Sequence, residues 1–360
     1  MIFLLRYFLA VSLVHLLEGV TFGDWVRLLR RERFRISPRR WPRALWITGM
    51  SLGNSVLARR VERRFGAAVR AAKVDAPVFI LGHYRSGTTY LHELLSLDDR
   101  FASPSRFQTF NPHTFLSTDR WLKPLVEPFM LPRRVQEDEV AHLVLTQLSP
   151  YLDWCFPRSP TGYGRYLTFR DAAPEEAAAW CAGVKSFLQA LTLQTGKPLV
   201  LKSPTHTARV RLLLQTFPDA RFVHIHRDPY KVFISTIGLL KAIQPVFRLQ
   251  GGPRAVDVDE VLRVYTEMYE AYFYDRALIP TGQLVEIAYE DLARDPVGQV
   301  RSIYESLSLG AFEPFRPALD AYLVTQAGYR KTRHPQLDAA LKARIAAAWS
   351  RTFDAWGYPR

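Results

Sequence analysis

The stretch that decides the fold spans residues 78–95 and reads VFILGHYRSGTTYLHELL. Its first four residues are apolar and rich in β-formers, which predicts a short buried strand that ends before Gly82. From Thr88 onward the apolar residues recur at helical spacing, which predicts a helix. The loop between them is bounded by Gly82 and Gly87, so several backbone N–H groups can converge on one anion at the positive end of a helix dipole. The stretch therefore predicts a phosphate-binding loop.

This loop nearly matches the pattern G-x-x-x-x-G-K-[ST] of the nucleotide-triphosphatase P-loop. Gly82, Gly87 and Thr89 occupy their positions, but Thr88 stands where the pattern has lysine. That lysine bridges the terminal phosphates in ATP and GTP hydrolases, and here only Arg85 returns a cation, from inside the loop. We therefore expect a loop that holds a nucleotide phosphate without cleaving a β–γ bond.

Two further apolar runs end in cationic side chains. Residues 199–204 predict a strand that ends at Lys202 and Ser203, and residues 221–226 predict a strand that leads into Arg227. Strands that alternate with helices imply a parallel sheet covered on both faces, with ligands beyond the carboxyl ends of its strands. The phosphate loop, Lys202 and Arg227 are therefore expected at one edge of the sheet.

The remaining elements follow from periodicity and from helix-start signals. Helices are predicted at 54–72, 174–193, 205–217, 296–307 and 337–356, and a fourth strand at 283–288. Residues 101–132 are rich in Pro, Phe and Thr and predict an irregular loop. Its aromatic side chains indicate either an apolar acceptor pocket or part of the core.

The sequence R-S-G-T-T after a strand resembles the 5′-phosphosulfate loop of the sulfotransferases, which use 3′-phosphoadenosine-5′-phosphosulfate (PAPS). The L-K-S-P segment around Lys202 resembles the segment whose lysine contacts the transferring sulfonate in that family. Arg227, followed eight residues later by Ser235, resembles the family's 3′-phosphate motif. The alternative for Arg227 is a salt bridge with Asp228 or another nearby acid.

Two later segments extend the resemblance, which covers about residues 77–333. The Y-E-D-L segment that begins at Tyr289 resembles a family landmark, although an ordinary strand end and helix cap is the alternative. The basic segment with Arg330 and Lys331 resembles the loop that closes over the 3′-phosphate, and a solvated charge run is its alternative.

The resemblance implies a P-loop-like α/β fold with three layers and a central parallel sheet, preceded by a basic amphipathic helical region. It also implies sulfonate transfer from PAPS to a hydroxyl, or less favourably to an amine, without a metal. Lys202 would neutralise the charge that develops on the sulfonate or on the bridging oxygen. The 5′-phosphosulfate would be held by Arg85 and by the N–H groups of Ser86, Gly87, Thr88 and Thr89.

An attacking alcohol needs a general base, and His or Glu is the usual one. Glu137 is favoured because an acidic cluster at 136–139 follows the predicted acceptor loop. These acids have a second interpretation, as first-turn residues that offset a helix dipole. The other candidates are Glu139, His113, His142 and His206.

The formal net charge is +14, and residues 1–65 hold 13 arginines against four acids. Residues 1–22 are apolar but are interrupted by charges, so a helix that lies in the membrane interface fits better than a spanning one. Trp41 and Trp46 stand among the arginines that follow, a composition that suits an anionic headgroup layer. The alternative is a helical subdomain packed on the core, with a solvated basic face.

These patterns predict an N-terminal helical region at 1–72 and a sulfotransferase domain at 73–360. We expect a cytoplasmic protein, peripheral on the inner face of the membrane, with a lipophilic acceptor. The two cysteines, Cys155 and Cys181, have no disulfide or metal spacing, and nucleic-acid motifs are absent. Oligomeric state has no signal in the sequence.

Two other functions remain open. A nucleotide phosphotransferase would share the fold but should carry the P-loop lysine. A non-enzymatic, anion-binding membrane-surface protein explains the basic residues but not the three converging strand ends.

Overall fold

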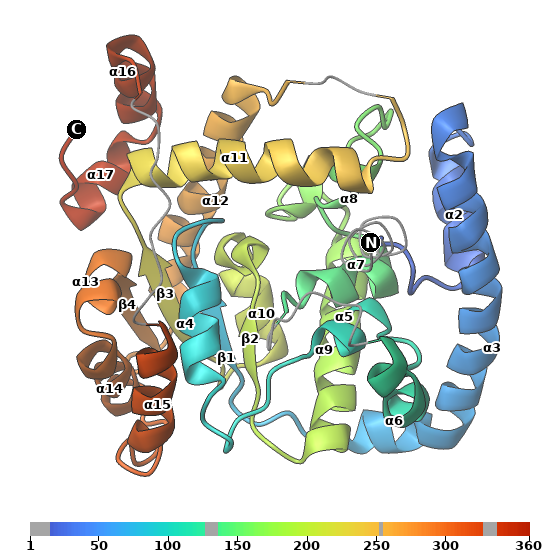
Figure 1. Cartoon of the computed structure of the whole chain (residues 1–360), viewed down its shortest axis with the longest axis horizontal. Coiled ribbons are helices and arrows are strands. Elements are labelled where there is room, and N and C mark those ends of the chain that lie inside the picture. The colour runs from blue at the N-terminus through green and yellow to red at the C-terminus, as the bar shows by residue number, and fades with distance from the viewer. Residues whose placement is uncertain (1–14, 127–135, 252–254, 327–336) are drawn as a thin grey trace. The chain divides into compact units, whose positions relative to one another are not determined.

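The computed structural model describes residues 15–126, 136–251, 255–326 and 337–360 (Figure 1). Most of the predicted interfacial helix at 1–22, and the predicted phosphate-closing residues Arg330 and Lys331, lie outside the described residues. The strands are β1 (Val78–Leu81), β2 (Val200–Lys202), β3 (Arg221–His226) and β4 (Leu284–Ala288). The α-helices are α2 (Phe22–Arg31), α3 (Trp41–Ala71), α4 (Thr88–Leu95), α5 (Arg106–Phe110), α6 (Phe115–Val126), α7 (Glu139–Thr146), α8 (Leu152–Cys155), α9 (Pro174–Thr195), α10 (Val210–Thr216), α11 (Pro229–Phe247), α12 (Val258–Asp275), α13 (Tyr289–Arg294), α14 (Pro296–Ser306), α15 (Arg316–Gln326), α16 (Ala339–Ala348) and α17 (Ser350–Trp356). Short 3₁₀ helices are η1 (Pro38–Arg40), η3 (Gly164–Tyr166), η4 (Pro204–Ala208) and η5 (Arg276–Leu278).

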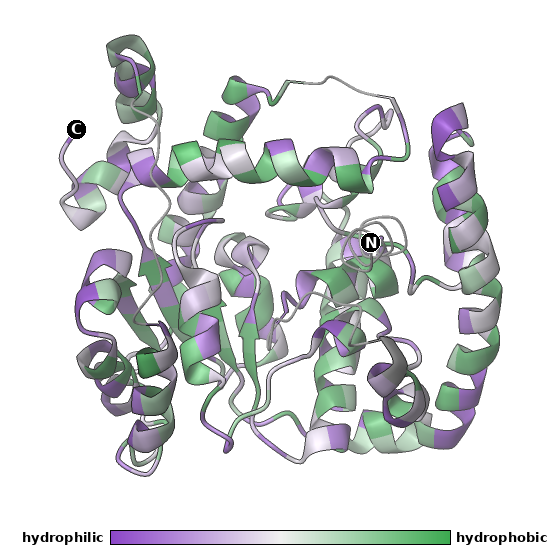
Figure 2. Ribbon diagram, in the orientation of Figure 1, coloured by the Kyte–Doolittle hydropathy of each residue, from purple (hydrophilic) through white to green (hydrophobic). Residues whose placement is uncertain are grey.

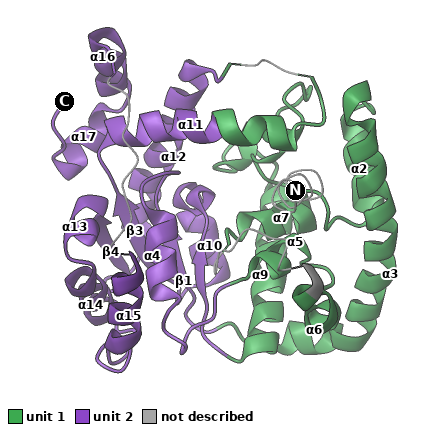
Figure 3. Ribbon diagram, viewed as in Figure 1, with its two compact units in different colours: residues 1–74, 104–196, 241–255 green, residues 75–103, 197–240, 256–360 purple. Residues whose placement is uncertain are grey.

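The chain divides into two compact units (Figure 3). The first, helical unit comprises residues 1–74, 104–196 and 241–255, and the second comprises 75–103, 197–240 and 256–360. The predicted boundary at residue 72 lies close to residues 74 and 75, where the chain first passes from the first unit to the second. The first unit also includes the later segments 104–196 and 241–255. The division at 72/73 into an N-terminal region and an enzymatic domain stays a prediction.

The second unit is built on a parallel sheet with the strand order β2-β1-β3-β4. Ile80 pairs with Lys202 on one side of β1, and Leu81 pairs with His224 on the other. Figure 2 shows the strands as predominantly apolar, as expected for strands covered on both faces. The four predicted strands are confirmed. The carboxyl ends of β1, β3 and β4 are the predicted ones, and β2 ends at Lys202, one of the two residues at which its end is predicted.

Helices cover both faces of this sheet, because successive side chains of a strand point to opposite sides. On one face, Val78 and Ile80 join a buried cluster with Leu91 of α4 and Ile303 of α14. On the other face, Phe79 packs against the rings of Phe217 and Phe222, and His224 stacks on Tyr272 of α12. Full burial of each large apolar side chain contributes roughly 1.5–3 kcal/mol. The predicted three-layer α/β fold is therefore confirmed.

The helical unit contains the basic region near the N-terminus. Pro42 lies in the first turn of α3, a position that proline tolerates, so a 31-residue helix starts there instead of the shorter predicted helix at 54–72. Trp180, Val184, Phe187 and Leu188 form the buried stripe of α9, as its periodicity predicts. No helix within the described ranges is both long and apolar enough to cross a membrane.

Three local predictions are wrong. The segment 101–132 is largely helical where it is described, because it contains α5 and α6. A capping box formed by Ser105 and Gln108 starts α5. The predicted helix at 205–217 is split at Arg209 into η4 and α10, since Pro204 starts a tighter 3₁₀ turn. The predicted helix at 337–356 is likewise divided, at Trp349, into α16 and α17.

Candidate active site

The loop that joins β1 to α4 has a backbone that only glycine accommodates at two positions. Gly82 and Gly87 have φ angles of 139° and 107°, in the left-handed region. A Cβ atom on Gly82 would lie 2.4 Å from the carbonyl oxygen of Ile225, and one on Gly87 would lie 2.4 Å from the ring of Tyr289. The two glycines therefore let the loop pass closely over the end of β3 and the start of α13.

Hydrogen bonds from the second unit hold this loop in place. The N–H of Gly82 donates to the Thr207 hydroxyl at 2.7 Å, and the N–H of His83 donates to the Tyr269 hydroxyl at 3.2 Å. Burial lowers the pKa of His83 to about 4, so its ring is neutral at physiological pH. The backbone of the loop is thus fixed before any ligand binds.

Ser86, whose N–H group is a predicted ligand of the 5′-phosphosulfate, also has contacts within the loop. Both its N–H and its hydroxyl donate to the carbonyl of His83, at 3.1 and 2.8 Å, and the residue is fully buried. Ser86 therefore closes the turn of the loop. Thr88 and Thr89 open α4, with Gly87 as its N-cap, and the first N–H groups of a helix have no acceptor within the helix.

The structure brings together three of the predicted cofactor residues. Arg85 donates from Nε to the Ser235 hydroxyl at 2.7 Å. Arg227 donates from Nη1 to the carbonyl of Arg85 at 3.2 Å. Two arginines and a serine, from the loop, the end of β3 and α11, thus form one cluster of donors at the carboxyl edge of the sheet.

Tyr289 is part of this cluster and not only a landmark in the sequence. The guanidinium carbon of Arg227 lies 4.2 Å from the centre of the Tyr289 ring, which is a cation–π arrangement. The sequence alternative for Arg227 was a salt bridge with Asp228, but Asp228 pairs with Lys231 at 3.3 Å. Within the described ranges Arg227 forms no ion pair.

The side chain of Lys202 is buried at the end of β2, only 2% exposed. Lys202 pairs with Ile80 of β1, and Ile80 lies two residues before Gly82, where the loop starts. The neighbouring Ser203 and Thr205 share a hydrogen bond of 2.8 Å between their hydroxyls. Lys202 thus reaches the same sheet edge as the loop and Arg227, as the alternation of strands and helices predicts.

An unused donor indicates that this cluster is built for an anion. The Nε atom of Arg227 is buried and has no hydrogen-bond partner among the described residues. Burying a guanidinium nitrogen without a partner costs free energy, and a phosphate oxygen is a strong acceptor for it. The first-turn N–H groups of α4 offer a second anion position. The residues present therefore fit a ligand with two anionic groups.

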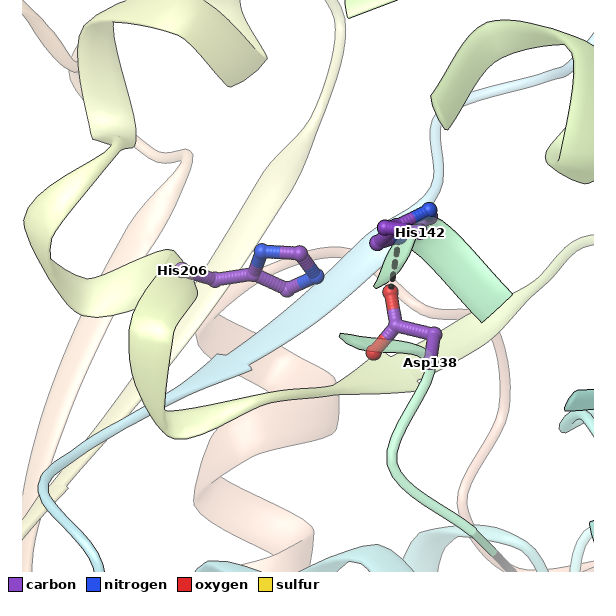
Figure 4. A group of neighbouring side chains, drawn as sticks. All are labelled: Asp138, His142 and His206. Carbon is purple, nitrogen blue, oxygen red and sulfur yellow. Dashed lines mark hydrogen bonds and ion pairs between the residues drawn. The ribbon is translucent and has the colours of Figure 1, made fainter. Parts of the chain in front are cut away.

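The candidate bases lie on the helical unit, except for His206. Glu137 is half-buried and accepts a hydrogen bond of 2.7 Å from the Tyr151 hydroxyl, whereas Glu139 is fully buried in the first turn of α7. His142 and Asp138 are joined by a 3.1 Å contact along α7, drawn in Figure 4.

The two other histidines are placed differently. His113 lines a cavity of about 330 Å³ within the helical unit, and its Nε2 lies 3.9 Å from a carboxylate oxygen of Asp24. His206 lies in η4, fully buried, with its ring edge-on to Phe79 at 5.4 Å. The structure therefore leaves Glu137 as the least buried of the acidic candidates.

Sequence reasoning missed the residues that support the loop. Thr207 and Tyr269 hold its backbone, and neither lies in a recognised motif. Thr207 could have been noticed because it follows Lys202 closely, at the same end of β2. Tyr269 lies in the middle of α12, and only the folded chain reveals its contact with His83.

Comparison with known proteins agrees with this geometry. A model of the sulfotransferase family matches residues 77–314. The chain is 38% identical over 354 residues to the omega-hydroxy-beta-dihydromenaquinone-9 sulfotransferase Stf3 of Mycobacterium bovis, and to the protein of the same name in Mycobacterium tuberculosis. The alignment covers 95% of this chain and 91% of each relative.

Solved structures resemble the fold. The sulfotransferase STF9 of Mycobacterium avium matches with a TM-score of 0.71 at 20% identity, over 89% of this chain and 86% of that one. The sulfotransferase STF1 of Mycobacterium tuberculosis matches with a TM-score of 0.63 at 19% identity, over 93% and 94%. With its family match and its close relatives, the chain belongs to the sulfotransferase family and is a sulfotransferase.

Proposed function

We propose that this enzyme takes its sulfonate from PAPS and that the cluster at the carboxyl edge of the sheet binds this donor. The observation that carries the proposal is the meeting of Arg85, Ser235 and Arg227 beside a glycine-bounded loop that lacks the P-loop lysine. PAPS has anionic groups at both ends of its ribose, which suits two separate anion positions. A nucleotide phosphotransferase is disfavoured, because Thr88 occupies the lysine position.

In this proposal each residue has a physical role. Arg85 and the first N–H groups of α4 hold the 5′-phosphosulfate, while Arg227 and Ser235 hold the 3′-phosphate. The face of the Tyr289 ring holds the guanidinium of Arg227 in place through the cation–π contact. Lys202 stabilises negative charge as the sulfonate leaves the donor. Arg330 and Lys331 stay predicted 3′-phosphate ligands.

Glu137 stays the proposed general base, because a base must reach the acceptor hydroxyl and Glu139 and His142 are fully buried. Its bond from Tyr151 holds the carboxylate in one orientation. Replacing Glu137 with glutamine is expected to lower kcat by about 100-fold and to leave donor affinity unchanged. An unchanged kcat would assign the proton transfer to another residue.

The acceptor is proposed to be a lipophilic alcohol. The relatives at 38% identity are named for omega-hydroxy-beta-dihydromenaquinone-9, a lipophilic, hydroxylated menaquinone derivative. The test supplies PAPS labelled with radioactive sulfur and compares an ω-hydroxylated polyprenyl quinone in vesicles with a soluble sugar. We expect label only in the lipid fraction, and equal labelling of the sugar would overturn the proposal.

We further propose that the helical unit docks on the anionic inner surface of the membrane. Trp41, Leu45, Leu52 and Val56 lie on one face of α3 and are 52–71% exposed. Exposed arginines precede this face at positions 33, 35 and 39. An apolar stripe beside a basic cluster is the chemistry that binds anionic headgroups.

Replacing Trp41 and Leu45 with serine is therefore expected to weaken binding to vesicles with anionic lipid by at least about tenfold, because each side chain loses a contact worth roughly 1.5–3 kcal/mol. Co-sedimentation measures the bound fraction. Trp121 and Leu122 of α6 are also exposed, and serine at those positions is the matched control. Equal loss in both variants, or undiminished binding after the change in α3, would refute this docking face.

A further inference from the structure

A tyrosine far along the chain connects two elements of the proposed donor site. The Tyr358 hydroxyl lies 2.9 Å from Nδ1 of His226 and donates to a carboxylate oxygen of Glu290 at 3.0 Å. His226 is the last residue of β3, and Glu290 is the second residue of α13. One side chain thus joins the end of a central strand to the start of the helix that follows β4.

The protonation of this group is determined by its surroundings. Burial lowers the pKa of His226 to about 3, so its ring is neutral at physiological pH. A hydroxyl can donate only one hydrogen bond, and the Tyr358 hydroxyl donates it to Glu290. The remaining contact therefore requires Nδ1–H of His226 to donate to the hydroxyl oxygen. Each of these two hydrogen bonds then has one donor and one acceptor.

The segment that carries Tyr358 is firmly anchored in the second unit. Trp349 stacks on Tyr265 of α12 at 3.6 Å, and Trp356 stacks on His226 at 4.7 Å with the rings 3° from parallel. Gly357 ends α17 with a φ of 66°, and this left-handed turn brings Tyr358 back, where its N–H donates to the carbonyl of Phe353. Tyr358 is thus held by packing as well as by its hydroxyl.

The two residues that Tyr358 binds adjoin the two residues that form the cation–π pair. His226 precedes Arg227 directly, and Glu290 follows Tyr289 directly. The other carboxylate oxygen of Glu290 lies 3.5 Å from the N–H of Asp228, which follows Arg227. The pairing of β3 with β4 already holds His226 beside Ala288, the residue before Tyr289. The hydroxyl of Tyr358 adds a side-chain link between the segments that carry Arg227 and the Tyr289 ring.

We propose that Tyr358 is a positioning residue for the 3′-phosphate site and that its hydroxyl tethers β3 to α13, so that Arg227 is oriented toward the phosphate. This role rests on the proposed binding of PAPS. Without the hydroxyl, His226 and Glu290 lose their common partner, and only the pairing of β3 with β4 and the contact of the Asp228 N–H with Glu290 still hold the two segments together. Affinity for the 3′-phosphate should fall, while the rest of the nucleotide binds as before.

The test measures dissociation constants of 3′-phosphoadenosine-5′-phosphate (PAP) and of 5′-AMP by calorimetry for the wild type and for Tyr358→Phe. Phenylalanine keeps the ring and removes only the hydroxyl. We expect PAP to bind about fivefold to tenfold more weakly, with 5′-AMP unchanged, so that selectivity for the 3′-phosphate falls by the same factor. Glu290→Gln, which weakens the same tether from its other end, should reduce selectivity in the same direction.

The matched control is Tyr272→Phe, because the Tyr272 hydroxyl also donates to a glutamate of the same unit, Glu286, at 2.8 Å. A merely structural tyrosine would lower the melting temperature without changing selectivity, as expected for this control. If the wild type preferred PAP to 5′-AMP and the Tyr358→Phe and Glu290→Gln variants kept the same preference, the proposed tether would be overturned and the proposed donor would stand. A wild type that binds PAP and 5′-AMP equally would overturn the proposed donor, and the tether with it.

Discussion

Replacing Lys202 with methionine is expected to lower kcat by about 100-fold to 1,000-fold, the usual effect of removing one preorganised group that stabilises transition-state charge. Methionine keeps an unbranched apolar side chain at this 2%-exposed position and removes the ammonium group with its charge and its N–H donors. PAP affinity should change little, since the proposed role arises as charge develops during transfer. Steady-state kinetics with labelled PAPS, together with PAP calorimetry, separates the two quantities.

The same measurements contain the result that would reject this role. If Lys202→Met raised KM for PAPS with kcat intact, the lysine would act in binding and not in the transfer step. A melting temperature equal to that of the wild type is the control for folding, because Lys202 lies in the central sheet beside β1.

Replacing Arg227 with alanine is expected to weaken PAP binding by roughly 10-fold to 150-fold, because a hydrogen bond to a charged group contributes about 1.5–3 kcal/mol. Binding of 5′-AMP should be unaffected, since 5′-AMP lacks the phosphate that Arg227 is proposed to hold. Calorimetry with both nucleotides measures this difference directly.

Arg294→Ala is the matched control for this variant. Arg294 is an exposed arginine of α13 that pairs with Asp291 in the same unit. The Arg294→Ala substitution removes the same charge from the protein as Arg227→Ala does, but leaves Arg85, Arg227 and Ser235 unchanged. If both variants weakened PAP binding equally, general electrostatic attraction would explain the effect and the assignment of Arg227 would fail.

The sequence predicted the site where chemistry and local pattern coincide. Each buried strand is a short apolar run, and parallel strands end at the same edge, so the meeting of the loop, Lys202 and Arg227 followed from alternation alone. Gly82 and Gly87 were noticeable because a tight loop needs their φ angles. The α/β fold and the central cluster were therefore predictable.

The parts that were not predicted depend on contacts between distant segments. The bond from the His83 N–H to Tyr269 joins residues 186 positions apart. The composition of segment 101–132, rich in Pro, Phe and Thr, predicts a loop, but the Ser105 capping box starts a helix there. Tyr358 has no motif around it, and its importance follows only from where α17 packs. Local patterns determine elements, whereas tertiary packing determines which residues support the site.

The most direct test of this account is calorimetric titration of the wild-type protein with PAP, with 5′-AMP and ATP as controls. We expect PAP to bind at least about tenfold more tightly than 5′-AMP, since one phosphate with charged hydrogen bonds contributes about 1.5–3 kcal/mol, and more tightly than ATP. Equal binding of PAP, ATP and 5′-AMP, or no binding of PAP, would contradict the assignment of this cluster as a PAPS site.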